Sequence, residues 1–247
     1  MKTILKGFLV AGIGLLTLVS CNKDKNDNRR WGYSVGYVTD AEPTANFTVL
    51  SDQGNTIHIK ETDYSGYKPA EGQRIIPEFY ILSENALSSG QRHYEVHLVG
   101  WSEILTKEIV EITAGNDEEL GNDGIAITDH WIANDYLTIE FQFRYNGPKK
   151  HFVNLGIDES KTYQDDKVHL EFRHNAYGDT SGPRVWGLVS FKLESLKEGL
   201  PEGTDELDLV VHSKTLDGDD IAKNIKYIFG ANLNHEAYSV HDYTDLE

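Results

Sequence analysis

Apolar residues occupy every second position over long stretches of the chain after residue 30, and this alternation is typical of β-strands. The clearest example is the stretch 137–144, whose apolar positions are Leu137, Ile139, Phe141 and Phe143. Successive side chains of a strand point to opposite faces, so each such stretch buries one face and exposes the other. The 13 Tyr, 9 Phe and 4 Trp also favour strands. We see no long amphipathic helix after the leader and no internal repeat, so we expect an all-β protein.

The alternating stretches fall into two groups, separated by the glycine-rich and polar stretch Gly115–Gly124, which lacks apolar periodicity. We expect strands at 33–37, 47–50, 56–60, 74–82, 92–101 and 104–112 in the first group, and at 137–144, 152–157, 168–173, 185–193, 207–212 and 225–229 in the second. The first group suits a small N-terminal OB-like barrel, with an isolated sheet or half-sandwich as the alternative. The second describes a C-terminal antiparallel β-sandwich. The predicted domains cover residues 31–113 and 114–247, with single helical turns at 195–200 and 220–224.

The N-terminal segment has the features of a lipoprotein signal peptide. Lys2 and Lys6 precede an apolar run over residues 8–19, which is too short for a comfortable membrane-spanning helix. The run ends in Leu18-Val19-Ser20-Cys21, an order that resembles the lipobox of bacterial lipoproteins. In that family the leader is cut before the cysteine, and the thiol carries diacylglycerol. The alternative is an ordinary signal peptide with a chance cysteine, but Cys21 is the only cysteine in the chain.

We therefore expect a signal peptide over residues 1–20, lipidation at Cys21 and a flexible polar tether over residues 21–30. Asn22, rather than aspartate, follows the cysteine. In Gram-negative lipoproteins this pattern resembles release to the outer membrane. The predicted location is the cell envelope, as an outer-membrane lipoprotein that faces the periplasm or the outside.

The charge of the chain restricts its partners. It has 40 Asp and Glu against 23 Lys and Arg, a net charge of −17, and removing a leader with two lysines makes this −17 − 2 = −19. Such a surface repels phosphate backbones, so we expect no nucleic-acid binding. With a single, lipidated cysteine, no internal disulfide is expected, and the fold must depend on its core.

Several motifs occur in a fixed order along the chain. They are Lys68–Arg74, Ile104–Lys107, Gly121–Asp123, Asp129–Ile132, Lys149–Leu155 and Leu170–Asp179. Together with the lipobox, this ordered set resembles the NigD-like lipoprotein family over nearly the whole mature chain. The resemblance implies an N-terminal OB-like domain and a C-terminal β-sandwich. It also implies a role around bacteriocin production or immunity, through the operon that gave the family its name, and it transfers no catalytic residue.

Two sets of residues have the chemical types found in metal sites. His93, Glu95 and His97 alternate and so share one strand face, where two imidazoles and a carboxylate can bind zinc. A solvated strand face is the favoured interpretation. The run Asp217–Asp220 resembles part of a calcium loop but lacks the glycine and glutamate that an EF-hand needs, so we expect a solvated turn.

The most unusual polar stretch lies at the end of an expected strand. It contains Arg173, His174, Asn175, Tyr177 and Asp179. These side chains together are the candidate recognition loop of the protein. The favoured alternative is a structural turn, in which Asn175 and Asp179 bond to nearby backbone and Tyr177 packs on the sandwich edge.

The sequence contains no nucleophile elbow, phosphate-binding loop, dinucleotide fingerprint or paired-cysteine site. We therefore predict a non-enzymatic, membrane-anchored envelope lipoprotein with a binding role and without a cofactor. The expected partner is an unidentified envelope or extracellular protein, in line with a bacteriocin-associated or immunity role. The alternative is a glycan-binding accessory lipoprotein, in which Trp131 and Trp186 would offer stacking faces; buried tryptophans, including Trp101, would weaken it.

Overall fold

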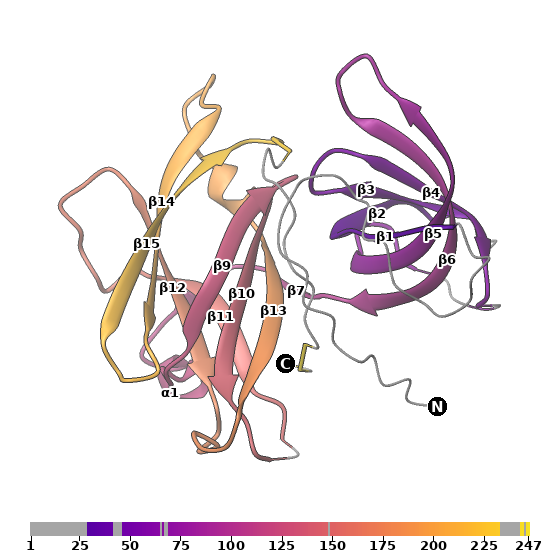
Figure 1. Cartoon of the computed structure of the whole chain (residues 1–247). Coiled ribbons are helices and arrows are strands. Elements are labelled where there is room, and N and C mark those ends of the chain that lie inside the picture. The colour runs from indigo at the N-terminus through magenta and orange to yellow at the C-terminus, as the bar shows by residue number, and fades with distance from the viewer. Residues whose placement is uncertain are drawn as a thin grey trace. The chain divides into compact units, whose positions relative to one another are not determined.

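The computed structural model describes residues 29–41, 46–64, 66, 69–147, 149–232, 243, 244, 246 and 247. Cys21 and the expected signal peptide lie outside these residues. Within them, no helix is long and apolar enough to cross a membrane. The chain folds into two compact units that divide between Ile104 and Leu105, and both are built almost entirely from strands (Figure 1). The all-β prediction is confirmed.

The first unit is a closed five-stranded barrel with one additional strand. Its strands are β1 (Arg30–Tyr33), β2 (Gly36–Ala41), β3 (Phe47–Ser51), β4 (Thr56–Thr62), β5 (Arg74–Ala86) and β6 (Arg92–Glu103). The ring runs β2–β3–β4–β6–β5 and returns to β2; the β4–β6 pair is parallel and the others are antiparallel. This is the strand order of an OB-type barrel, as expected from the sequence. Within the described residues, strand β1 pairs with β5 alone.

The barrel unit buries an apolar cluster and an ion pair. The apolar cluster consists of Val38, Phe47, Val49, Ile57, Ile59, Ile75, Phe79, Tyr94, Val96 and Leu98. Arg74 on β5 is 1% exposed and Asp52, in the β3–β4 turn, is 0% exposed. The two guanidinium Nη atoms of Arg74 donate to the two carboxylate oxygens of Asp52 at 2.5 and 2.9 Å. The pair therefore ties the turn to the barrel wall.

The expected first strand, 33–37, is interrupted in the structure. Strand β1 ends at Tyr33 and β2 begins at Gly36. Between them, the carbonyl oxygen of Val35 accepts a hydrogen bond from the Asp52 N–H at 2.9 Å. That carbonyl therefore bonds to the β3–β4 turn and is not part of a continuous strand ladder.

The second unit is a β-sandwich of two sheets. Its elements are β7 (Leu105–Lys107), β8 (Val110–Ile112), α1 (Asp117–Leu120), β9 (Ala126–Ala133), β10 (Tyr136–Arg144), β11 (Phe152–Asp158), β12 (Val168–Asn175), β13 (Arg184–Lys192), the 3₁₀ turn η1 (Glu194–Lys197), β14 (Glu206–Lys214) and β15 (Asp220–Ile228). One sheet has the order β7–β13–β10–β9, and the other has the order β15–β14–β12–β11–β8.

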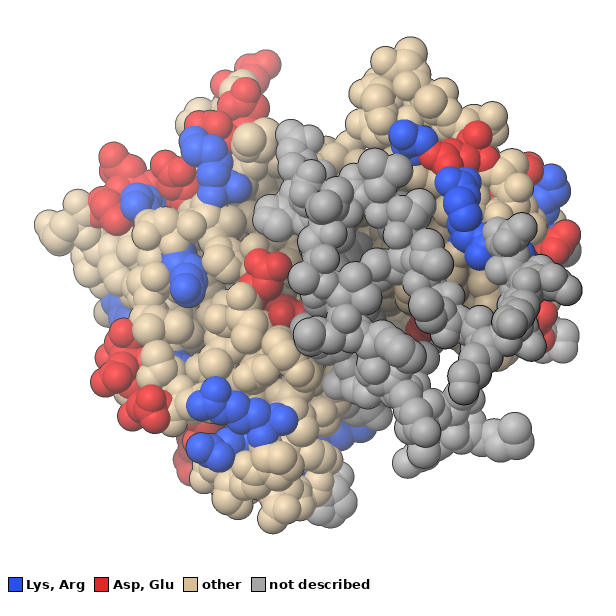
Figure 2. Space-filling model, in the orientation of Figure 1, with Lys and Arg blue, Asp and Glu red and all other residues tan. Residues whose placement is uncertain are grey.

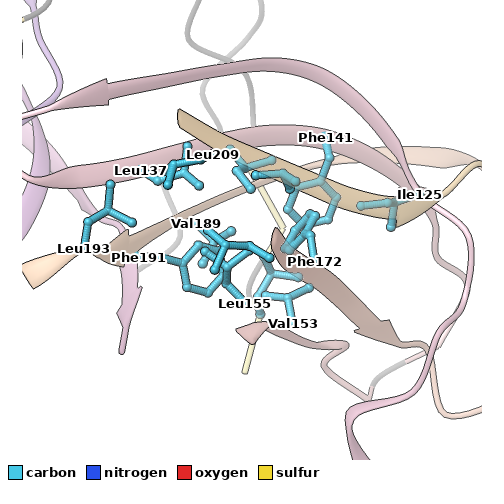
Figure 3. Packing of buried hydrophobic residues seen from close by; sticks show 14 of the residues in the cluster. Ile125, Leu137, Phe141, Val153, Leu155, Phe172, Val189, Phe191, Leu193 and Leu209 are labelled. Carbon is cyan, nitrogen blue, oxygen red and sulfur yellow. The ribbon is translucent and has the colours of Figure 1, made fainter. Parts of the chain in front are cut away.

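The inner faces of both sheets form the main core (Figure 3). The four apolar positions of β10 expected to share a face are all buried. They meet Leu170 and Phe172 of β12 and Val189 and Phe191 of β13 in one cluster. Phe172 packs edge-on against Phe141 and Phe191, with ring centroids 5.3 and 5.9 Å apart. The alternation therefore identified the buried faces of these strands correctly.

The stretch 104–112 differs from the expected single strand of the first domain. It forms two short strands, β7 and β8, which pair in parallel with β13 and β11 of the sandwich. The chain crosses from one sheet to the other at Glu108–Ile109. Because the observed division precedes Leu105, it lies earlier than the predicted boundary at 113/114. Alternation alone does not show which sheet an edge strand will join.

Three further elements differ in detail from the sequence expectations. Strand β9 was not expected, and its ladder with β10 is irregular between Glu140 and Phe141. Residues 220–224 begin strand β15 and do not form the expected helical turn, because they pair along β14. The helical turn expected at 195–200 corresponds to η1, and the expected linker contains the short helix α1.

The described residues between 243 and 247 complete one edge of the sandwich. Tyr243 forms a parallel bridge with Trp186 of β13, and Leu246 forms one with His151, just before β11. The Glu247 N–H donates to the His151 carbonyl, and the Val153 N–H donates to the Glu247 carbonyl, both at 2.9 Å. Leu246 enters the main core. This segment therefore pairs with both sheets, as β7 and β8 do further along the same strands.

Candidate functional site

The polar stretch that begins in the last residues of β12 lies against helix α1. The Arg173 side chain is buried and donates from Nε to the Gly121 carbonyl and from Nη2 to the Asp117 carboxylate, both at 2.6 Å. The Asn175 amide donates to the Glu119 carbonyl at 2.8 Å. These bonds satisfy carbonyl groups at the end of α1, which have no partner within the helix. The two side chains therefore fasten the α1 segment to the sandwich.

His174 points into the sandwich and forms a buried pair with His151. It is 2% exposed, and its Nε2 lies 2.9 Å from Nδ1 of His151. Phe143 packs on both rings, at centroid distances of 4.8 and 5.6 Å. Burial, and to a lesser extent the neighbouring His151, lower the pKa of His174 to about 4, although Asp123 acts in the opposite direction. Burial also lowers the pKa of His151 against the opposing effect of Asp179. Both imidazoles are therefore neutral at pH 7.

Asp179 and Tyr177 have different environments. The Asp179 carboxylate accepts hydrogen bonds from the N–H groups of Asn146 and Gly147 at 2.9 and 2.7 Å. These bonds lower the pKa of Asp179. Tyr177 is exposed, has a positive φ of 52° and lies under the Lys149 ammonium, which is 3.2 Å from the ring centroid.

Arg173, His174 and Asn175 end strand β12, and Tyr177 and Asp179 lie in the turn that follows. Most of these side chains contact other parts of the sandwich. Arg173, Asn175 and Asp179 hold neighbouring backbone, and His174 belongs to the core. Asn175 and Asp179 bond to backbone, as in the structural-turn alternative, whereas Tyr177 is exposed and lies under Lys149. Tyr177 alone presents a large exposed side chain, so a recognition role for this stretch stays a proposal centred on that residue.

His93, Glu95 and His97 share the outer face of β6, as their spacing predicts. Glu95 is occupied by Lys60 and Ser83, both at 2.9 Å. His97 lies between Glu61 and Asp63, at 3.1 and 2.9 Å. In the part of the chain that the structure describes, no group of three His, Cys, Asp or Glu side chains is arranged to hold a metal ion. The contacts are those of a solvated strand face.

A second histidine pair, not anticipated from the sequence, lies on the outer face of the β12–β14 sheet. His169 Nδ1 is 2.8 Å from His212 Nε2, and His169 Nε2 is 2.7 Å from the Asp165 carboxylate. Tyr163 stacks on His169 with ring centroids 3.4 Å apart. When both imidazoles are neutral, the carboxylate fixes the proton on His169 Nε2, so His212 Nε2–H donates to His169 Nδ1. Alternation places His169 and His212 on outward positions, but only the strand pairing brings them together.

The remaining candidates from the sequence, the tryptophans and the Asp217–Asp220 run, have the surroundings of structural residues. Trp131 is buried, whereas Trp101 and Trp186 are half-buried. The Asp217–Asp220 run forms the β14–β15 turn, in which the Thr215 N–H donates to the Asp219 carbonyl at 2.8 Å. Asp220 pairs with Lys214 at 2.6 Å.

Comparisons with known proteins agree with this architecture. A family model described as the NigD-like C-terminal beta sandwich domain matches residues 108–227. A search of curated proteins found no match. Among solved structures, a protein described as toxin related from Parabacteroides distasonis is 31% identical, with a TM-score of 0.65, and the alignment covers 80% of this chain and 93% of that one.

Two other solved structures share the fold at lower identity. A protein of unknown function from Bacteroides vulgatus is 23% identical, with a TM-score of 0.66, over 86% of this chain and 96% of that one. A NigD-like immunity protein from Bacteroides caccae is 16% identical, with a TM-score of 0.62, over 79% and 96%. These two likenesses concern the fold alone, whereas the 31% identity extends to the sequence across both units.

Proposed function

Because this chain belongs to the NigD-like family, we propose that it is a non-enzymatic lipoprotein of the cell envelope that binds a toxin-related polypeptide and acts in immunity. The observation that carries the proposal is the 31% identity, across most of both chains, to a protein described as toxin related. The fold shared with an immunity protein supports the same role. Fold alone does not assign function, so a binding surface has to be identified separately.

The anchoring part of the proposal concerns Cys21. A Cys21→Ala variant is expected to move from the membrane pellet to the soluble fraction of the envelope, because it loses the acylated residue that would hold an acidic body on a membrane. Fractionation followed by immunoblotting measures this change. A Ser20→Ala variant keeps the thiol and is expected to stay in the pellet. A Cys21→Ala protein that stays membrane-bound, with an unchanged apparent mass, would show that Cys21 is not lipidated.

The barrel unit offers a surface for a polypeptide partner. Strands β5 and β6 form a long hairpin that rises from the barrel (Figure 1). Leu82 and Leu87, near its tip, are 44% and 43% exposed. Large apolar side chains that stay exposed on one projecting hairpin are candidates for contact with another protein. In OB folds the corresponding hairpin loop also contributes to ligand binding.

The binding proposal predicts capture of one polypeptide by the immobilised protein. The full chain, purified in detergent, is coupled to a resin and exposed to culture supernatant and envelope extract, and the bound material is identified by mass spectrometry. We expect one near-stoichiometric, secreted polypeptide. A Leu82→Ser/Leu87→Ser variant is expected to retain at least tenfold less of it, because it removes the apolar contact area.

The matched control is Ile228→Ser, which removes another large exposed apolar side chain, 49% exposed, from strand β15 of the sandwich. This variant should capture the polypeptide as the wild type does. Equal capture by the hairpin variant would show that the polypeptide contacts another part of the protein. Failure of the wild type to retain any secreted polypeptide would contradict the immunity role itself.

A further inference from the structure

Four side chains form a square on the outer face of strands β1 and β5. Trp31 lies opposite Tyr80, and Tyr33 lies opposite Glu78, in the antiparallel ladder. All four point outward, because cross-strand partners share a face and Phe79, between the two residues of β5, is buried in the barrel core. Each of the four side chains is half-buried. Three aromatic rings and one carboxylate are therefore close enough together to contact a single group that approaches this face.

The aromatic rings of the square offer faces that attract a cation. The rings of Trp31 and Tyr33 are tilted rather than stacked, with centroids 5.3 Å apart and planes at 56°. The guanidinium carbon of Arg29, the residue before β1, lies 4.1 Å from the centroid of the Tyr80 ring. One ring of the square thus already contacts a guanidinium group. The indole of Trp31 is the aromatic ring that attracts cations most strongly.

Glu78 adds a negative charge that has no partner within the described part of the chain. Its carboxylate forms no hydrogen bond or ion pair there. Its cross-strand partner on β6 is Gly100, which has no side chain to bond to it. Burial raises the pKa of Glu78, and no described cation lies close enough to oppose this effect. A cation that bonded to this carboxylate would therefore stabilise its charged form.

Two carboxylates further along the same strands show the contrast. Glu84 of β5 pairs with Arg30 at 2.7 Å, and Glu95 of β6 pairs with Lys60 at 2.9 Å. Figure 2 shows basic side chains next to acidic ones on the visible face of the barrel. Glu78, beside three aromatic rings, lacks such a partner. The net charge of −17 also attracts cationic molecules to the protein as a whole.

We propose that Trp31, Tyr33, Glu78 and Tyr80 form a binding site for an arginine side chain of a basic polypeptide. The guanidinium plane stacks on the aromatic rings and donates to the Glu78 carboxylate, a combination that suits arginine because its cation is planar and weakly hydrated. Leu82, on the projecting hairpin, is two residues after Tyr80, so one polypeptide can contact both. The site rests on the polypeptide-binding role proposed above and gives the chemistry of that partner.

The test uses the full chain in detergent, with ¹⁵N in the indole rings of its four tryptophans. Hexa-arginine amide, hexalysine amide and hexaglycine amide are titrated at about 0.15 M salt, which screens attraction by distant acidic groups. We expect hexa-arginine to shift the indole resonance of Trp31, which a Trp31→Phe variant assigns. Hexalysine should bind at least fivefold more weakly, and hexaglycine should cause no shift. The resonances of the other three tryptophans should stay in place.

The Glu78→Gln variant keeps the shape of the side chain and removes its charge, so it should bind hexa-arginine at least tenfold more weakly. Its thermal unfolding temperature should be equal to or above that of the wild type, because the charge that it removes is half-buried and unpaired. The matched control is Glu71→Gln, which removes an exposed carboxylate from the turn before β5. It should leave the affinity for hexa-arginine unchanged.

The proposal is overturned if hexa-arginine leaves the Trp31 resonance in place, if hexalysine or hexaglycine binds equally well, or if Glu78→Gln binds as the wild type does. These results are separate from the capture experiment. A captured polypeptide without a shift of Trp31 would reject the arginine site alone. A shift of Trp31 with the expected variant effects, but without a captured polypeptide, would support the site and contradict the immunity role.

Discussion

Replacing Arg74 with methionine is expected to lower the free energy of unfolding of the barrel unit by about 3–5 kcal/mol. Both Arg74 and Asp52 are buried, and both guanidinium Nη atoms bond to the carboxylate. Methionine fills much of the side-chain volume but leaves the Asp52 charge without its cation in the barrel wall. The cost is therefore that of a buried charge that has lost its two-bonded ion pair, rather than that of a cavity.

Urea unfolding followed by tryptophan fluorescence measures the change, and hydrogen exchange assigns the affected transition to the barrel. The matched control is Arg92→Met, because Arg92 pairs with Glu84 at an exposed position, and we expect a loss below about 1 kcal/mol. The double variant Asp52→Ala/Arg74→Met should recover part of the loss, since it removes both charges. A single Arg74→Met variant that unfolds like the Arg92→Met control would contradict this account.

The second large effect is a dependence of sandwich stability on pH. The folded-state pKa of His174 is about 4, below the ordinary value of 6.5, so the unfolded chain binds a proton that the folded chain does not. Stability is therefore complete above about pH 6.5 and falls as the pH approaches 4. For a difference of this size the loss is about 3 kcal/mol. The lowered pKa of His151 adds to the loss in the same direction.

The measurement is the free energy of unfolding of wild type and His174→Gln at pH 8, 7, 6, 5 and 4. Surface carboxylates also titrate below pH 5, but they do so in both proteins, so the difference between the two curves isolates the histidine. That difference should be constant between pH 8 and 7 and should shrink as the pH falls. Parallel curves over the whole range would show that His174 does not titrate as its burial requires.

His174 also shows how much of the site was present in the sequence. It continues the parity of Leu170 and Phe172 along β12, so alternation placed it on the buried face. Its chemical type, and the neighbouring Arg173 and Asn175, instead made the stretch a candidate recognition loop. The structural role of these residues depends on their contacts with α1 and His151. Both are distant in the sequence, so no local sequence pattern predicts these contacts.

The sequence predicts the regular strands correctly. It does not predict the elements whose place depends on which strands pair with each other. The four apolar positions of β10 are buried as alternation requires, and the barrel closes in the expected order of strands. Strand β9 pairs with β10 across an irregular register, which weakens the alternation that would have revealed it. Ion pairs such as Arg74–Asp52 and cross-strand neighbours such as Trp31–Tyr80 exist only once the register is set.

The edge formed by Tyr243, Thr244, Leu246 and Glu247 has a consequence for the order of folding. Its partners His151 and Val153 are made about ninety residues earlier, and a contact over that separation forms slowly because a long loop must close first. A nascent sandwich therefore keeps an open edge on β13 and β11 until residue 247 has been synthesised. During that interval the exposed strand edges are able to pair with other chains. Holding the chain unfolded until this segment has been synthesised would avoid this hazard.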